Sequence, residues 1–174
     1  MRKICTFALY FVCAIVFAQS QKVTVFLVNP KLYPNNDNCD KVAASIRTIS
    51  ATPAVANAAL VELFRGLTDS EKSAGFESLF SSDTSQILKK INVRSGIAYV
   101  NLTDNVRTSL GNATSSCGRA TFFAQIERTL KQFKTVKSIY YAIDDEPKAF
   151  FEWMEFDMAR CKKTAHRCSA QPFK

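Results

Sequence analysis

A change in the spacing of hydrophobic residues marks the segment from Cys117 to Ile143 as the organising element of the chain. In its first half, apolar residues recur every three or four positions, as on one face of an amphipathic helix; these are Phe122, Phe123, Ile126, Leu130 and Phe133. In its second half, Ile139, Tyr141 and Ile143 alternate with other residues, which places them on one side of a β-strand. Because only residues 134–136 separate the halves, the pattern predicts a helix that turns directly into a strand and packs on its sheet.

The segments near the N-terminus predict two strands and two helices. Residues 23–28 (VTVFLV) are apolar at nearly every position, as in a strand covered on both faces. Residues 42–49 fit both the period of a strand and that of a helix. The presence of Arg47 and Thr48 in so short a segment favours the strand. We expect a helix over residues 52–66, because Thr-Pro favours a helix start and glycine a helix end. Residues 68–71 (TDSE) form a capping box for a second, shorter helix.

A β-hairpin is predicted where residues 87–93 and 97–102 flank a turn at residues 94–96 (RSG). Residues 103–116 are small and polar and predict a loop. The resulting order, ββααββαβ, predicts an α+β fold with one mainly antiparallel sheet of about five strands and two main helices packed on it.

Residues 146–174 predict a C-terminal aromatic helix and a basic tail that contains two cysteines. Pro147 can open this helix. The simpler interpretation of its apolar residues is a helix docked on the core. The alternative is an exposed apolar patch that binds a partner, formed by Phe150, Phe151, Trp153 and Phe156.

The length of 174 residues suits one domain, and a hydrophobic content of 47% allows a sizeable core. The formal net charge is +8, of which Arg2 and Lys3 belong to the leader described below. Five of the remaining six charges come from a tail without acidic residues, which contains Arg160, Lys162, Lys163, Arg167 and Lys174. Because the body of the chain is nearly neutral, the charge pattern argues against nucleic acid as a partner.

Residues 1–18 predict a secretory signal peptide, with two basic residues before an apolar run and a cleavage site near Ala18. The apolar run is shorter than the roughly 20 residues that a membrane span needs. Cys13 suggests a bacterial lipid anchor as an alternative, but Val12 stands where a small residue is expected. We therefore expect a secreted protein, or one in the periplasm or cell envelope.

Export would leave four cysteines in an oxidising compartment, which predicts two disulfides with three alternative pairings; these residues are Cys39, Cys117, Cys161 and Cys168. A zinc site would have to combine the last two with His166. That spacing fits no common structural zinc site, and a fourth ligand is not apparent. The sequence predicts neither a metal nor a cofactor.

The sequence contains no nucleophile elbow, phosphate-binding loop or dinucleotide fingerprint. Glu152 and Glu155 would share a helix face and could serve acid–base hydrolysis of a cell-wall glycan. Acidic residues on an amphipathic helix are more often its solvated side, so we predict no enzymatic activity. Asn101 and Asn112 lie in glycosylation sequons that matter only in a eukaryotic host, where Asn112 is the better candidate.

Taken in order, these segments resemble the GerMN domain family of sporulation and germination proteins. The resemblance covers residues 23–145. The matching stretches are VTVFLVNP (23–30), CDKV and IRTI (39–49), TPAVANAALVELFRGLT (52–68), DSEKSAG (69–75), VRSGIAYVNL (93–102), SCGRATFFAQIERTLKQF (116–133) and TVKSIYYAID (135–144). The chain departs from the family at Leu67, where a proline is usual, and at Asp144-Asp145, in place of an Asp-Gly-type turn.

The resemblance implies that residues 42–49 form a strand. It also implies a pairing of Cys39 with Cys117, because cysteines at these two positions recur together in similar domains, and this leaves Cys161 with Cys168. The family is not known for enzymes, and its members act as binding or assembly modules of the cell envelope. The implied role is an exported, non-catalytic module that self-associates or holds one envelope protein. The alternative is a secreted protein that binds or hydrolyses cell-wall glycan.

Overall fold

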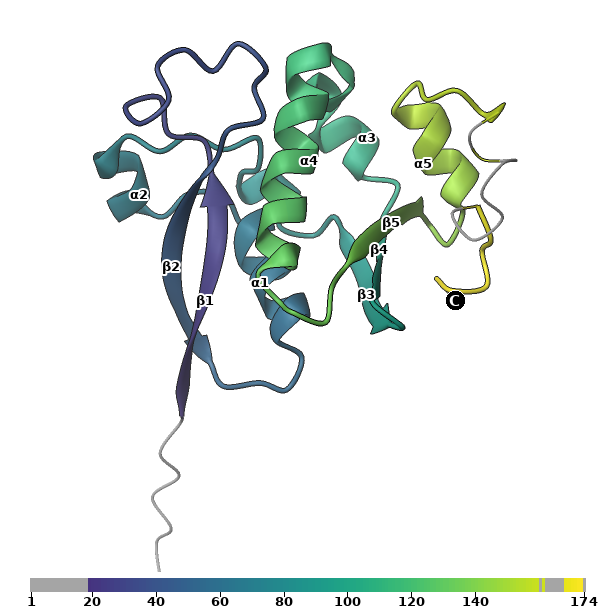
Figure 1. The fold of residues 1–174 in the computed structure, drawn as a ribbon, viewed down its shortest axis with the longest axis horizontal. Coiled ribbons are helices and arrows are strands. Elements are labelled where there is room, and N and C mark those ends of the chain that lie inside the picture. Colours follow the sequence, from purple (N-terminus) through teal and green to yellow (C-terminus); the bar gives the residue numbers. More distant parts are fainter. Residues whose placement is uncertain (1–18, 160, 162–167, 174) are drawn as a thin grey trace, which may run out of the picture.

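The computed structural model describes residues 19–159, 161 and 168–173 (Figure 1). Its elements are β1 (Ser20–Leu27), β2 (Ala43–Ser50), α1 (Val55–Phe64), α2 (Asp69–Ala74), η1 (Ser82–Thr84), β3 (Leu88–Arg94), β4 (Ile97–Leu102), α3 (Val106–Ser109), η2 (Gly111–Thr114), α4 (Ser116–Lys131), β5 (Ser138–Ile143) and α5 (Pro147–Trp153). Several predictions concern residues outside this range: the signal peptide with Cys13 and Ala18, the role of His166, and the basic side chains of the tail.

The α+β class is confirmed, but the prediction of one five-stranded sheet is wrong. The strands form a two-stranded antiparallel sheet, β1–β2, and a three-stranded sheet in the order β3–β4–β5. Within the second sheet, β3 and β4 form the predicted antiparallel hairpin, whereas β4 and β5 run parallel. Helix α4 lies between the two sheets (Figure 1).

The sheets stay separate because side chains of α4 occupy the hydrogen-bonding edge of β1 that a further strand would need. The amide of Phe26 donates to Thr129 Oγ1 at 3.1 Å, and its carbonyl accepts from Gln125 Nε2 at 3.3 Å. Two residues earlier, the Thr24 amide donates to Gln132 Oε1 at 3.2 Å, and the Thr24 carbonyl accepts from Gln132 Nε2. The backbone groups of this edge are therefore satisfied by a helix.

The hydrophobic core follows the apolar stripe predicted for α4. Phe122, Ile126 and Leu130 are fully buried, as are residues of β1, α1 and β4 that face them. Tyr141 and Ile143 of β5 join this core, and Ile139 packs at its margin, as the alternation predicts. The opposite face of the three-stranded sheet carries a smaller cluster, in which Tyr99, Ala142 and Phe173 pack together.

Two local predictions differ from the structure. Helix α1 begins at Val55 and has no side-chain cap, because Thr52 Oγ1 instead accepts from the Ala54 amide in the turn before the helix, at 3.1 Å. The predicted loop at 103–116 contains the short elements α3 and η2, and its apolar residues Val106, Leu110 and Ala113 are buried. The capping box of α2 is confirmed: Thr68 Oγ1 accepts from the Glu71 amide, and the Glu71 carboxylate accepts from the Thr68 amide.

The C-terminal helix α5 docks on the core, so the alternative of an exposed patch is wrong for three of its four residues. Phe150, Phe151 and Trp153 are buried, and Phe156 is half-buried. The ring of Phe150 stacks on Tyr141 of β5 with centroids 4.8 Å apart, which fixes the helix against the sheet. Among the residues that the structure describes, no helix is long and apolar enough to cross a membrane.

Candidate binding site

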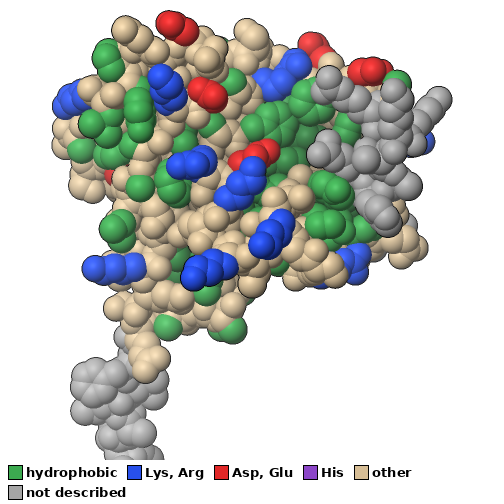
Figure 2. Space-filling model, viewed as in Figure 1, with side chains coloured by type: hydrophobic (Ala, Val, Ile, Leu, Met, Phe, Trp, Pro, Cys, Tyr) green, Lys and Arg blue, Asp and Glu red, His purple; other side chains and the backbone are tan. Residues whose placement is uncertain are grey.

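An aromatic cavity of about 270 Å³ lies between α4, β5 and α5. Figure 2 shows hydrophobic side chains gathered on this face between α4 and α5. The cavity is lined by six aromatic residues, one aliphatic residue and one acid: Phe123, Tyr140, Tyr141, Phe150, Phe151 and Phe156, with Ile139 and Glu127. Pockets of this composition, mostly apolar with a few polar groups, are typical of small-molecule binding sites.

The periodicity of two elements brings the lining together. Phe123 and Glu127 are four residues apart on α4 and therefore lie on the same face of the helix. Ile139 and Tyr141 are two residues apart on β5 and share one face of the sheet. Phe156 follows α5 and stacks on Phe123, with centroids 5.8 Å apart and planes inclined by 19°.

Tyr141 is the unusual member of this lining, because its hydroxyl is buried and finds no hydrogen-bond partner among the described residues. Burial raises the pKa of Tyr141 well above its ordinary value, and the negative charge of Glu127 raises this pKa further. The phenol is therefore neutral throughout the physiological range. An unpartnered buried hydroxyl is costly, so its position calls for an explanation beyond packing.

Charged side chains lie on the α4 side of the cavity. Lys131 Nζ donates to Glu127 Oε2 at 2.6 Å, and both side chains are partly exposed. Arg119, on the first turns of α4, places its guanidinium 5.4 Å from the centre of the Phe156 ring. That cation also donates to the Thr114 carbonyl and lies 3.6 Å from a carboxylate oxygen of Glu155. The ring of Phe156, one of the residues that line the cavity, therefore already lies against the Arg119 cation.

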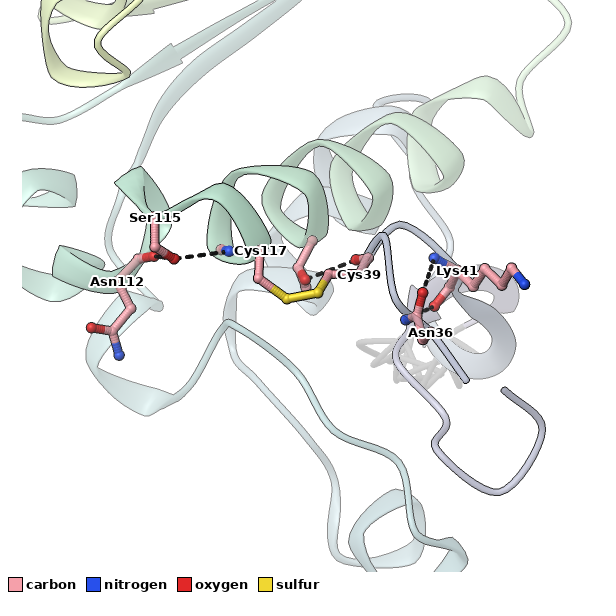
Figure 3. Close-up of a disulfide and its surroundings, with 8 residues drawn as sticks. Asn36, Cys39, Lys41, Asn112, Ser115 and Cys117 are labelled. Carbon is pink, nitrogen blue, oxygen red and sulfur yellow. Dashed lines mark hydrogen bonds between the residues drawn. A yellow bond between two sulfur atoms is a disulfide. The ribbon is translucent and has the colours of Figure 1, made fainter. Parts of the chain in front are cut away.

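A second candidate surface surrounds the disulfide between Cys39 and Cys117, shown in Figure 3. This pairing is the one that the family resemblance implies, and it ties the loop after β1 to the start of α4. Thr121 Oγ1 donates to the Cys39 carbonyl at 2.9 Å, beside the disulfide. Asn36 folds the loop by accepting from the Lys41 amide and donating to the Lys41 carbonyl. These contacts give the loop a structural role.

The remaining candidates for chemistry are dispersed. Cys161 and Cys168 form the second disulfide, so all four described cysteines are paired. Glu152 and Glu155 are exposed and do not share a helix face, because α5 ends at Trp153. In the described part of the chain, no three His, Cys, Asp or Glu side chains lie close enough together to hold a metal ion.

The two sequon asparagines differ in exposure. Asn101 is buried on β4, where its side chain donates to Asp145 Oδ1 at 2.8 Å and accepts from the Asp145 amide at 3.0 Å. This engagement leaves Asn101 unsuitable as a glycosylation acceptor. Asn112 is exposed in η2.

The second edge of β2 forms a third candidate surface, since no described strand pairs with it. The outward-facing residues of β2 are exposed and uncharged: Ala44, Ile46, Thr48 and Ser50. Ile46, at 67% exposure, and Leu32, at 62%, are the most exposed large hydrophobic residues described. Arg47 points the other way and is buried, bonded through Nε and Nη2 to the two carboxylate oxygens of Glu71.

The family model of Germane, described as sporulation and spore germination, matches residues 24–149. The chain therefore belongs to the Germane family, and the predicted GerMN-like domain is confirmed. Among solved structures, it is similar to the tandem GerMN domains of the sporulation protein GerM from Bacillus subtilis. That similarity has a TM-score of 0.51 and 14% sequence identity, over 72% of this chain and 40% of that chain.

The chain is also similar to the first GerMN domain of GerM alone, with a TM-score of 0.52 and 14% identity. This comparison covers 71% of the present chain and 83% of the other. At such identity the likeness shows the fold alone. No curated protein matches the chain.

Proposed function

We propose that this sporulation and germination-type domain is a non-catalytic module that is exported to the cell envelope and self-associates there through the free edge of β2. Family membership supports a role in sporulation or germination, while the signal-peptide pattern of residues 1–18 supports export. Among the described residues, no three His, Cys, Asp or Glu side chains gather at a metal site, and the four cysteines are paired in disulfides; both observations support a role without catalysis.

The observation that carries this proposal is the edge of β2 that no strand of the described residues pairs with. Exposed edge strands present unpaired amide and carbonyl groups, and proteins usually block them with proline, lysine or a bulge. The eight residues of β2 contain neither proline nor lysine, and their pairing with β1 is regular. The one charged side chain, Arg47, is held by Glu71 on the inner face and does not guard the edge.

A second copy of the chain fits this edge. In an antiparallel pairing of two β2 strands about a two-fold axis, each copy presents the same surface. The outward residues would then bring Ile46 near its counterpart, and they oppose no like charges because they are uncharged. An edge-to-edge contact of this kind would extend the two-stranded sheet to four strands.

The experiment compares the oligomeric state of the protein with that of Ile46→Lys, measured by sedimentation velocity across a range of concentrations. Leu32→Lys is the matched control, because it adds the same charge at a similarly exposed hydrophobic residue. We expect the wild type and Leu32→Lys to associate and Ile46→Lys to be monomeric. A monomeric wild type, or an Ile46→Lys protein that associates like the control, would contradict the proposal.

Binding or hydrolysis of cell-wall glycan is the alternative, and the positions of Glu152 and Glu155 give it less support. Both carboxylates are exposed; Glu152 lies within α5, and Glu155 follows the end of that helix. A Glu152→Gln protein should therefore match the wild type in any lytic assay. Loss of lytic activity in this variant would favour the hydrolase.

A further inference from the structure

We infer that the aromatic cavity between α4, β5 and α5 binds a small organic cation, an arylalkylammonium ion in particular. This site is distinct from the β2 edge, which lies on the other sheet (Figure 1). The inference rests on the aromatic walls, on an unpartnered phenol within them, and on the sign of the single charge in the lining.

The walls offer flat apolar faces to a ring. Tyr141 and Phe150 stack nearly parallel, with planes inclined by 12°, and Phe123 meets Tyr141 edge-on with centroids 5.4 Å apart. The volume of about 270 Å³ suits a molecule with one ring and a short chain. Aromatic pairs favour these stacked and edge-to-face arrangements, so a ligand ring can extend the cluster in the same geometry.

Tyr141 is one of the residues that line the cavity, and its hydroxyl is buried beneath the cavity surface. Among the described residues it has no hydrogen-bond partner, although it is buried. A phenylalanine would fill the same space without burying an unsatisfied group. A ligand that shifts the lining enough to uncover this hydroxyl, and that carries a donor beside its ring, would supply the missing partner.

The charge in the lining of the cavity favours a cation. Glu127 is the only charged residue of the lining, and its carboxylate can accept from a second donor in addition to Lys131. Lys131 is about half exposed and reaches Glu127 along the helix surface. Arg119 shows that a ring of the same cluster, Phe156, already lies against a cation. Within the lining, an ammonium ion gains from both the carboxylate and the ring faces, and an anion gains from neither.

The test is a titration with three probes that share a phenyl ring and differ in charge: 2-phenylethylammonium, 2-phenylethanol and 3-phenylpropanoate. Trp153 is the only tryptophan of the chain, and its ring lies 5.9 Å from that of Phe150, so its fluorescence reports on the cavity. We expect saturable binding of the cation with a dissociation constant of about 1 mM or below, as ligand efficiency allows for a molecule of this size. The anion should bind about tenfold or more weakly, the effect of one charge-assisted contact.

Two variants locate the site. Glu127→Gln should weaken binding of the ammonium probe about five- to tenfold and leave the neutral alcohol unchanged, because only a charge is removed. Tyr141→Phe should weaken the ammonium probe severalfold without lowering the melting temperature, since it removes an unsatisfied hydroxyl. Glu152→Gln is the matched control, an exposed carboxylate outside the lining.

The inference is overturned if the ammonium probe shows no saturable binding, or if the anion binds as tightly as the cation. It is also overturned if Glu127→Gln and Glu152→Gln have equal effects. Because Glu127 is partly exposed on α4, its replacement by glutamine preserves the fold and keeps the test decisive even if Tyr141→Phe proved unstable.

Discussion

Replacement of Gln125 by leucine tests whether side chains of α4 stand in for a strand at the edge of β1. Gln125 is fully buried, and its Nε2 donates to the Phe26 carbonyl and to Ser78 Oγ, at 3.3 and 3.1 Å. Its Oε1 accepts from the Leu79 amide at 3.0 Å. Leucine has a similar size but offers none of these bonds, so the variant leaves two backbone groups without partners.

The expected loss of stability follows from those two groups. Each buried backbone group left unsatisfied costs about 1–3 kcal/mol. The more apolar leucine side chain offsets about 1–2 kcal/mol of this through the hydrophobic effect. At the middle of each range, about 2 kcal/mol for each of the two groups less about 1.5 kcal/mol leaves a net reduction in the free energy of unfolding of about 2.5 kcal/mol, which for a domain of this size corresponds to a melting temperature lower by about 5–10 °C.

The assay is urea denaturation at 25 °C under oxidising conditions, followed by tryptophan fluorescence and circular dichroism. Gln86→Leu is the control, because Gln86 is exposed and the same substitution there should change stability by about 0.5 kcal/mol or less. If Gln125→Leu lost less than about 1 kcal/mol, or no more than the control, the hydrogen bonds from α4 would not be what separates the two sheets.

Two further predictions concern the buried ion pair and the disulfides. Burial works to raise the pKa of Glu71, but its hydrogen bonds with Arg47, Ser45 and the Thr68 amide outweigh burial and hold the pKa below the ordinary value of 4.5. Because the folded-state pKa is the lower one, the ion pair stabilises the protein above pH 4.5, and this contribution is lost as the pH falls through the folded-state pKa. Glu71→Gln should therefore lower the free energy of unfolding at pH 7 by about 3–5 kcal/mol. Urea midpoints measured from pH 7 to pH 3 should then fall less steeply in the variant than in the wild type. An equal fall in the variant and the wild type would refute this role of the ion pair. Removing the Cys39–Cys117 disulfide, which closes a 78-residue separation, should cost about 4–5 kcal/mol, and removing Cys161–Cys168, with a separation of 7, only about 2 kcal/mol. Equal losses in the two double-alanine variants, measured by the same denaturation, would contradict the chain-entropy explanation.

Local patterns in the sequence predicted most elements of the fold correctly. The change of period after Phe133 identified α4 and β5, and the capping box at residues 68–71 identified α2. In these cases the signal is local, because the helix period or the cap lies within a few residues. Residues 42–49 fit two periods, so their pattern favoured a strand only by a small margin, and the family resemblance implied the same strand.

The division into two sheets depends on contacts that sequence spacing does not encode. Gln125 and Thr129 on α4, and Gln132 at its C-terminal cap, are polar side chains of an amphipathic helix and would ordinarily face water. Their partners on β1 lie about a hundred positions earlier in the chain. Only the three-dimensional arrangement shows that these side chains complete a strand edge.

The aromatic cavity was missed for a related reason. In the sequence, Glu127 and Lys131 have the spacing of an ordinary ion pair four residues apart on a helix, and Tyr141 is one more alternating position of β5. The available signal for the cavity was the hydroxyl of Tyr141, a polar atom on a strand face whose other residues, Ile139 and Ile143, are apolar. The same limitation applies to α5, whose aromatic residues could face a partner or the core until the stacking of Phe150 on Tyr141 was known.

The central claim is assembly of the exported protein through the edge of β2, and photocrosslinking in cells tests it most directly. A photoreactive amino acid would replace Ile46 in one strain and Leu32 in another, and the envelope fraction would be analysed after irradiation by mass identification of the adducts. We expect the probe at position 46 to yield an adduct of two copies of this chain, and the probe at position 32 to yield none. Absence of that adduct, or adducts of equal yield from both positions, would contradict the account.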